Sequence, residues 1–194
     1  MTIPSLVLAS SSPYKRRLMR RLGIEFDSVS PEIDESRLDG ESPTEMACRL
    51  AEAKAMTIRQ RRPDAWVIGA DQIAASGDRV FGKPGGRDEA ISQLEQLEGT
   101  THQLITAVAL SHRDKAADVS VTTYDMVMRP LTPDQIRRYV DEDTPFDCAG
   151  SYKIEQAGIR LFEATRGDDP TAIEGLPLTR VWTLLLEAGE RSAG

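Results

Sequence analysis

The fold of this chain is decided near its start, by the stretch Leu6-Val7-Leu8-Ala9-Ser10-Ser11-Ser12-Pro13-Tyr14-Lys15-Arg16-Arg17. An apolar run that fits a buried strand ends in three serines, and Pro13 then opens a helix, because proline suits the first helical turn. A strand followed directly by a helix is the unit from which α/β folds are built. The serine hydroxyls, the helix N-terminus and the cations at 15–17 would also suit a phosphate group, although a capped basic surface helix has the same pattern.

Strands and helices alternate along the rest of the chain, which predicts an α/β fold. The sequence Ser42-Pro43-Thr44-Glu45 is a capping box that opens the second helix. The predicted helices lie near residues 13–22, 43–62, 88–97, 133–141 and 177–188. The predicted strands lie near residues 5–10, 25–30, 66–72, 103–112, 119–128 and 159–163.

Composition narrows the classes of function. The 194 residues are 40% hydrophobic and 28% charged, which is typical of a soluble globular domain or of two small lobes. A net charge of −7 argues against binding to duplex nucleic acid. No segment reaches the ~20 apolar residues of a membrane span. Two cysteines, Cys48 and Cys148, and the absence of a secretory leader favour a cytoplasmic setting.

Carboxylates occur at two places where they suggest chemistry. Asp71 ends the apolar run Val67-Ile68-Gly69-Ala70, so we expect it at the end of a strand, where α/β folds bind ligands. There it could hold a divalent cation or accept a proton from water, although a turn residue is the alternative. The run Pro31-Glu32-Ile33-Asp34-Glu35 would attract magnesium if its carboxylates converge, although a solvated acidic loop is the commoner reading.

Three later stretches are weaker signals. Phe81-Gly82-Lys83-Pro84-Gly85-Gly86 places a lysine suited to phosphate oxygens among turn residues, and a surface loop fits equally well. Residues 148–155 and 167–178 are rich in small residues, which would let a ligand approach the backbone. By themselves, these two stretches are also compatible with ordinary loops.

Taken in order, these stretches resemble the Maf family of nucleoside triphosphate pyrophosphatases. The matching strings are LASSSPYKRR, PEIDES, RLAEAKA, VIGADQI, GKP, TAVAL, CAGSYKIE and GLPL, and they cover nearly the whole chain. The resemblance implies one Maf-like domain over residues 1–194. Its α/β fold would be like that of the inosine-triphosphate pyrophosphatases, with a mixed central sheet and two lobes around a deep nucleotide cleft. It also implies hydrolysis of a nucleoside triphosphate to the monophosphate and pyrophosphate, with Mg²⁺ or Mn²⁺.

The resemblance also assigns roles by matching position. It implies a phosphate site at Ser10 and Lys15, metal ligands at Glu35 and Asp71, and catalytic residues at Asp71, Lys54 and Lys83. Asp71 falls on the family's proton acceptor, and whether it is base, metal ligand or both stays open. Lys15 stands where the family usually has arginine, and lysine cannot make arginine's bidentate contact with phosphate.

Base choice in the family is associated with the positions of Tyr14, Gln72 and Glu155. Here the chain reads SPYK, GADQ and GSYKIE. Members that cleave dTTP and UTP read SPRR, GADT and AYGIQG, whereas the group that cleaves 7-methyl-GTP reads SPWRR, GSDQ and GSFKSEG. The chain therefore resembles the second group, with Tyr14 in place of its tryptophan.

The chemistry of 7-methylguanine agrees with that subgroup. Methylation at N7 gives the base a positive charge, which attracts an aromatic face such as that of Tyr14. A carboxylate such as Glu155 would accept from N1–H and the 2-amino group, and would disfavour uracil and thymine. The alternatives are that Tyr14 packs on its own helix and that Glu155 is a surface charge. A pyrimidine or inosine substrate, a non-catalytic role in arrest of cell division, and a homodimer are also compatible with the sequence.

Overall fold

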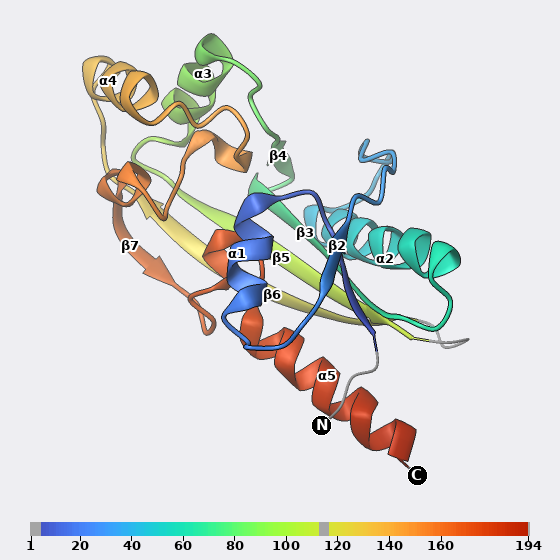
Figure 1. Cartoon of the computed structure of the whole chain (residues 1–194). Helices are drawn as coiled ribbons and strands as arrows, with labels where there is room; N and C mark the ends of the chain where they lie inside the picture. Colours follow the sequence, from blue (N-terminus) through green and yellow to red (C-terminus); the bar gives the residue numbers. More distant parts are fainter. Residues whose placement is uncertain (1–4, 113–116, 194) are drawn as a thin grey trace. The chain divides into compact units, whose positions relative to one another are not determined.

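The computed structural model describes residues 5–112 and 117–193, without the side chains of residues 191–193. Within these ranges strands and helices alternate except at two pairs of consecutive strands, within residues 66–81 and 101–128 (Figure 1), and the predicted α/β fold is confirmed. The strands are β1 Leu6–Ala9, β2 Asp27–Val29, β3 Trp66–Ser76, β4 Arg79–Phe81, β5 Thr101–Ser111, β6 Asp118–Met128 and β7 Phe162–Arg166. The α-helices are α1 Pro13–Arg20, α2 Pro43–Arg61, α3 Arg87–Leu97, α4 Pro133–Asp143 and α5 Leu178–Ala193. The short 3-10 helices are η1 Ala149–Ser151, η2 Ala157–Leu161 and η3 Ala172–Glu174.

The strands form one mixed sheet in the order β2-β1-β3-β5-β6-β7, with β4 paired to β3. β1 runs parallel to both β2 and β3, and its last residue, Ala9, is in register with Val29 and Gly69. β4 runs antiparallel to β3, and β7 runs antiparallel to β6. The parallel strands need crossover connections, which α1 and α2 supply. Among the described residues, no helix is long and apolar enough to cross a membrane.

Two compact units make up the chain. The first comprises the described residues of Met1–Asp71, Thr106–Thr122 and Asp169–Gly194. The second comprises Gln72–Ile105 and Thr123–Asp168. β3, β5 and β6 therefore contribute residues to both units, because each of these strands contains a unit boundary.

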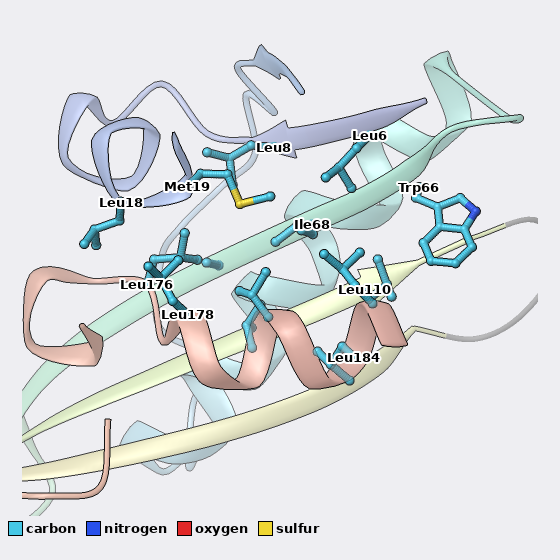
Figure 2. Close-up of a cluster of buried hydrophobic side chains, with 14 of the residues drawn as sticks. Leu6, Leu8, Leu18, Met19, Trp66, Ile68, Leu110, Leu176, Leu178 and Leu184 are labelled. Carbon is cyan, nitrogen blue, oxygen red and sulfur yellow. The ribbon is translucent and has the colours of Figure 1, made fainter. Parts of the chain in front are cut away.

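The core of the first unit lies between its strands and the helices α1 and α5. Figure 2 shows Leu8 and Ile68 on the strands facing the same cluster as Leu18 of α1 and Leu184 of α5. Side chains alternate along a strand, so the residues of β3 in this cluster are every second one, beginning at Trp66. Each fully buried leucine or isoleucine of such a core contributes roughly 1.5–3 kcal/mol.

The opposite face of β3 in the first unit packs against α2. This helix begins with the predicted capping box, in which Ser42 Oγ accepts from Glu45 N at 3.2 Å and Glu45 Oε2 accepts from Ser42 N at 2.8 Å. A Cβ added to Gly69 would lie 2.1 Å from the Ala51 carbonyl oxygen. Glycine on the strand and alanines on the helix thus let the two backbones approach closely.

The second unit has a core of its own. α3 packs against α4 and η1, and both helices bury apolar side chains such as Leu94 and Ile136. Met126 and Met128 of β6 are also fully buried. The helix α4 begins with a capping box, in which Thr132 Oγ1 accepts from Gln135 N at 3.3 Å.

Two strand predictions were wrong. β3 continues beyond residue 72 to Ser76 and turns at Gly77 into β4, because Ala74 pairs with Phe81 across a hairpin that had not been predicted. The strand predicted at 159–163 begins as η2, and β7 follows at Phe162–Arg166. Predicted helix bounds agree with the observed ones more closely, although α5 runs to Ala193 rather than to residue 188.

Candidate active site

Asp71 lies inside β3 and not at the end of a strand, so the predicted position was wrong. It shares the strand face of Gly69, which packs against α2. Asp71 is buried, at 7% exposure, and a buried carboxylate requires a partner because its transfer from water is costly. That partner comes from α2.

Lys54 of α2 brings two acidic side chains together. Its Nζ donates to Asp71 Oδ1 at 2.6 Å and lies 2.7 Å from Glu35 Oε1. Lys54 is also buried, at 8% exposure, whereas the side chain of Glu35 is half exposed. One cation and two carboxylates therefore share one point of the first unit, and they carry a net negative charge.

The surroundings of Lys54 keep its ammonium charged. Burial acts to lower the pKa of Lys54, but attraction to Asp71 and hydrogen bonds to Asp71 and Glu35 outweigh it, so the pKa is raised above 10.5. Lys54 is therefore a fixed positive charge at neutral pH. Such a charge can neutralise phosphate oxygens in a site of low dielectric.

A second ion pair, between Arg49 and Glu41, holds the loop that carries Glu35 against α2, and neither residue is among the predicted site residues. Arg49 Nε and Nη2 bind the two carboxylate oxygens of Glu41 at 2.5 and 2.8 Å, and Nη2 also donates to the Ser36 carbonyl at 3.0 Å. Ser36 follows Glu35, so Arg49 holds the backbone next to this acid. The signal was present in the string RLAEAKA, where Arg49 and Lys54 occur on the same helix.

The acidic run after β2 does not converge as a cluster of three carboxylates. Asp34 Oδ1 accepts from Ser36 N at 2.9 Å within its own loop, and Glu32 is exposed. Glu35 is the member of the run that contacts Lys54. Glu32 and Asp34 therefore fit the alternative of a solvated acidic loop, whereas the role of Glu35 as a metal ligand stays a prediction.

Ser10 lies directly after β1, and its loop uses the predicted hydroxyls to order itself. Ser10 Oγ accepts from Ser12 N at 3.1 Å, and the Ser10 carbonyl accepts from Ser28 Oγ at 2.7 Å. Ser12 caps α1 by accepting from Lys15 N at 3.4 Å. Because Ala9 is in register with Gly69, Ser10 lies beside the part of β3 that carries Asp71.

Tyr14 and Lys15 lie in the first turn of α1 and are both half-buried. The guanidinium of Arg17 lies 6.0 Å from the centre of the Tyr14 ring, and Arg17 also pairs with Glu174 at 2.8 Å. Arg17 belongs to the same helix as Tyr14, so this contact is compatible with the alternative of packing on its own helix, and the role of Tyr14 toward a base stays a prediction. One cation is thus already close to the Tyr14 ring, at a distance typical of cation–π contacts.

The other predicted residues belong to the second unit. Gln72 is the next residue of β3 after Asp71, and Lys83 is exposed between β4 and α3. Glu155 lies half-buried in the turn between η1 and η2. The first unit therefore brings Glu35, Lys54 and Asp71 into contact and also contains Ser10, and the second contains Gln72, Lys83 and Glu155.

The acids of the first unit fit one mode of divalent-metal binding. The oxygens of Glu35 and Asp71 converge on the same Lys54 Nζ, within 2.7 Å. Among the described residues, no group of three or more His, Cys, Asp or Glu side chains could hold a metal by itself. Mg²⁺ is commonly bound by one or two carboxylates together with phosphates and waters, and this pair suits that arrangement.

Comparison with known proteins places these residues in a family. The model of a family described as Maf-like protein matches residues 5–188. A Xanthomonas campestris protein named 7-methyl-GTP pyrophosphatase is 45% identical over 187 residues, covering 96% of this chain and 97% of the relative. A Pseudomonas aeruginosa protein of the same name is 43% identical over 188 residues, covering 96% of this chain and 98% of the relative.

Solved structures are more distant. The Staphylococcus aureus Ham1 protein matches 81% of this chain and 93% of its own chain, at 16% identity and a TM-score of 0.47. A likeness at that level supports no argument about activity. The family match and the two relatives each span nearly the whole chain, and on that basis the chain belongs to the Maf family.

Proposed function

We propose that this chain is a nucleoside triphosphate pyrophosphatase that hydrolyses 7-methyl-GTP to its monophosphate and pyrophosphate. The observation that carries the proposal is the buried ion pair of Lys54 and Asp71, which Glu35 joins from the acidic loop. Relatives named 7-methyl-GTP pyrophosphatase at 45% and 43% identity support the choice of substrate.

Asp71 is the proposed proton acceptor. It takes a proton from the water that attacks the α-phosphorus, a new P–O bond forms, and the bond to the bridging oxygen of the β-phosphate breaks. Lys54 fixes the Asp71 carboxylate through a hydrogen bond at 2.6 Å, which holds the base in one orientation. General-base assistance of this kind typically contributes ~10²–10⁴ in rate.

The triphosphate requires positive charge along its length. Lys54 and Lys83 are proposed to neutralise phosphate oxygens, and Ser10 and Lys15 to bind others at the start of α1. Glu35 and Asp71 would hold a divalent cation, Mg²⁺ or Mn²⁺, which when bound neutralises charge on the phosphates. Positioning and charge neutralisation provide most of the catalysis in reactions at phosphorus.

The base is proposed to be read by Tyr14, Gln72 and Glu155. The Glu155 carboxylate would accept from N1–H and the 2-amino group of guanine and would complement the positive charge of the methylated ring. Tyr14 would stack on the base. Since Arg17 lies close to the Tyr14 ring, we expect stacking to contribute less to selectivity than the Glu155 contact.

A nucleotide panel tests the proposal. The purified chain is incubated with Mg²⁺ and 7-methyl-GTP, GTP, UTP, dTTP or ITP, and pyrophosphate and orthophosphate are measured separately. We expect pyrophosphate from 7-methyl-GTP at the highest kcat/KM. A preference for UTP, dTTP or ITP would show that the proposed substrate is wrong and the proposed reaction right. Nucleotide binding without any hydrolysis would favour a non-catalytic role.

A further inference from the structure

Two consecutive residues of the segment before Glu155 are held by buried polar side chains. Ser151 Oγ donates to Gln93 Oε1 of α3 at 2.7 Å. The hydroxyl of Tyr152 lies 2.8 Å from His102 Nε2 of β5. All four residues belong to the second unit and are nearly inaccessible to solvent, with Ser151 at 0%, His102 at 1%, Tyr152 at 4% and Gln93 at 6% exposure.

Lys153, the residue after Tyr152, is held through its backbone N–H group. Lys153 N donates to the Tyr139 hydroxyl of α4 at 2.9 Å. The carbonyl of Lys153 then accepts from Gln156 N at 3.1 Å and from Gly158 N at 3.0 Å, which closes the turn that contains Glu155. A Cβ added to Gly158 would lie 2.4 Å from that carbonyl oxygen, so the turn requires glycine there. Tyr139 therefore holds the residue on which the Glu155 turn closes.

The backbone of the segment is also unusual. Gly150 has a φ of 75° and Ser151 a φ of 63°, so two successive residues adopt the left-handed region. A residue other than glycine rarely adopts this region, and it persists where the surroundings enforce it. Two described hydrogen bonds hold the second of these residues: Ser151 N donates to the Cys148 carbonyl at 3.1 Å, and Ser151 Oγ donates to Gln93.

Apolar side chains would fill these positions without the cost of burying polar atoms. Buried polar pairs contribute little net stability compared with well-packed apolar groups, but they specify one geometry because each donor needs its own acceptor. Three such contacts come from three different elements, α3, β5 and α4, and meet three adjacent residues. This pattern indicates that the three contacts serve to fix the position of segment 151–153 more than to stabilise the fold.

We propose that Gln93, His102 and Tyr139 are positioning residues that hold segment 151–153 so that Glu155 meets the base of the nucleotide. The inference rests on the proposed function, since it takes Glu155 as the reader of the guanine edge. It predicts that selectivity between bases depends on residues that do not touch the nucleotide. A variant that lacks one of these contacts still contains Glu155, but the turn that carries Glu155 is less firmly held.

The test uses near-isosteric variants of the whole chain that remove one hydrogen-bonding group each. Gln93→Met removes the acceptor for Ser151, and Tyr139→Phe removes the acceptor for Lys153 N. Each should lower the ratio of kcat/KM for 7-methyl-GTP to that for UTP by roughly threefold to tenfold, the equivalent of one ordinary hydrogen bond. The change should come from a higher KM for 7-methyl-GTP, with kcat for UTP nearly unchanged.

Two controls separate positioning from a merely structural role. Gln96→Met makes the same substitution on the exposed part of α3 and should leave the ratio unchanged. Ser151→Ala should lower the ratio as Gln93→Met does, and the double variant should lower it no further, because both remove the same hydrogen bond. A purely structural role would reduce the folded fraction, measured by circular dichroism, and scale both activities equally.

The outcomes distinguish this inference from the proposed function. If Glu155→Gln lowers the ratio but Gln93→Met and Tyr139→Phe, both folded, leave it unchanged, the positioning role is overturned and the proposed function stands. If the wild-type chain shows no preference for 7-methyl-GTP, the proposed substrate falls and the inference falls with it. A lowered ratio in both variants with an unchanged ratio in Gln96→Met supports the inference.

Discussion

Replacing Asp71 with asparagine should abolish turnover while the chain stays folded. Asparagine is nearly the same size as aspartate but cannot accept a proton from water at neutral pH. Loss of a general base typically costs ~10²–10⁴ in rate, equivalent to about 3–5 kcal/mol of barrier. We therefore expect kcat for Asp71→Asn to fall by at least a hundredfold for every nucleotide.

The cost to stability is smaller, because Lys54 keeps a second partner. The substitution removes the charge that lies 2.6 Å from Lys54 Nζ, but Glu35 remains at 2.7 Å. The asparagine amide oxygen can still accept from Lys54 Nζ, so the loss is at most the roughly 1.5–3 kcal/mol of one hydrogen bond to a charged group, whereas leaving a buried charge wholly unpaired costs about 3–5 kcal/mol. The lower range applies here. A domain of ordinary stability, about 5–15 kcal/mol, would remain mostly folded after this loss.

Asp169 offers a matched control in the same unit. It is 2% exposed, and its two oxygens accept from the backbone and hydroxyl groups of Thr171 and Thr179 at 2.6–2.9 Å. Asp169→Asn turns one of these oxygens into an NH2 group, so it should lower the free energy of unfolding by at least as much as Asp71→Asn and leave kcat per folded molecule near that of the wild type. Urea unfolding gives the folded fraction, and pyrophosphate release gives the rate. Near-normal pyrophosphate release by Asp71→Asn would remove Asp71 from the mechanism.

Three further predictions concern other groups. Lys83→Ala should lower kcat/KM by similar factors for all nucleotides, because every substrate shares the phosphates, and a changed base preference would instead assign Lys83 to the base site. Glu155→Gln should lower selectivity for 7-methyl-GTP over UTP by about tenfold or more, the equivalent of roughly 1.5–3 kcal/mol for a charge-assisted hydrogen bond, and an unchanged ratio would show that Glu155 does not read the base. Burial lowers the pKa of His102 from 6.5 to about 4, so the stability that the neutral, buried His102 gives the fold is fully present above pH 6.5 and is lost as the pH falls toward 4. When the pH falls from 6.5 to 5, the free energy of unfolding measured in urea should decrease by ~2 kcal/mol more for the wild type than for His102→Phe. Equal decreases in the two proteins would contradict this.

Helix starts could be predicted well because their signals are local. Ser42 and Glu45 satisfy each other's backbone groups within one turn, and Thr132 and Gln135 do the same in α4. Pro13, Pro43 and Pro133 each lie in the first turn of their helices, as the sequence indicated. Such contacts involve residues three or four apart, so the sequence shows both partners side by side.

The position of Asp71 could not be predicted in the same way. The sequence predicts that its polar side chain ends an apolar strand, but β3 continues because β4 pairs with its second half. Asp71 can remain inside the strand because Lys54, seventeen residues earlier, neutralises it. Neither the hairpin nor the ion pair has a signal near Asp71 itself.

Contacts between distant residues account for the rest of what the sequence did not show. Gln93 and Ser151 are 58 residues apart, and neither stands out by type or spacing. Arg49 was visible in a family-like string, but its role in holding the Glu35 loop depends on where Glu41 and Ser36 lie in space. Family resemblance supplied candidate residues such as Lys54 and Glu155, and the contacts that position them come from the fold.

The most direct test of the central claim follows the oxygen atom of the attacking water. The wild-type chain hydrolyses 7-methyl-GTP in water labelled with heavy oxygen, and the products are separated and weighed by mass spectrometry. Attack on the α-phosphorus predicts that the label enters 7-methyl-GMP and that the pyrophosphate stays unlabelled. Label in orthophosphate with 7-methyl-GDP as the second product, or label in the pyrophosphate, would contradict the proposed reaction.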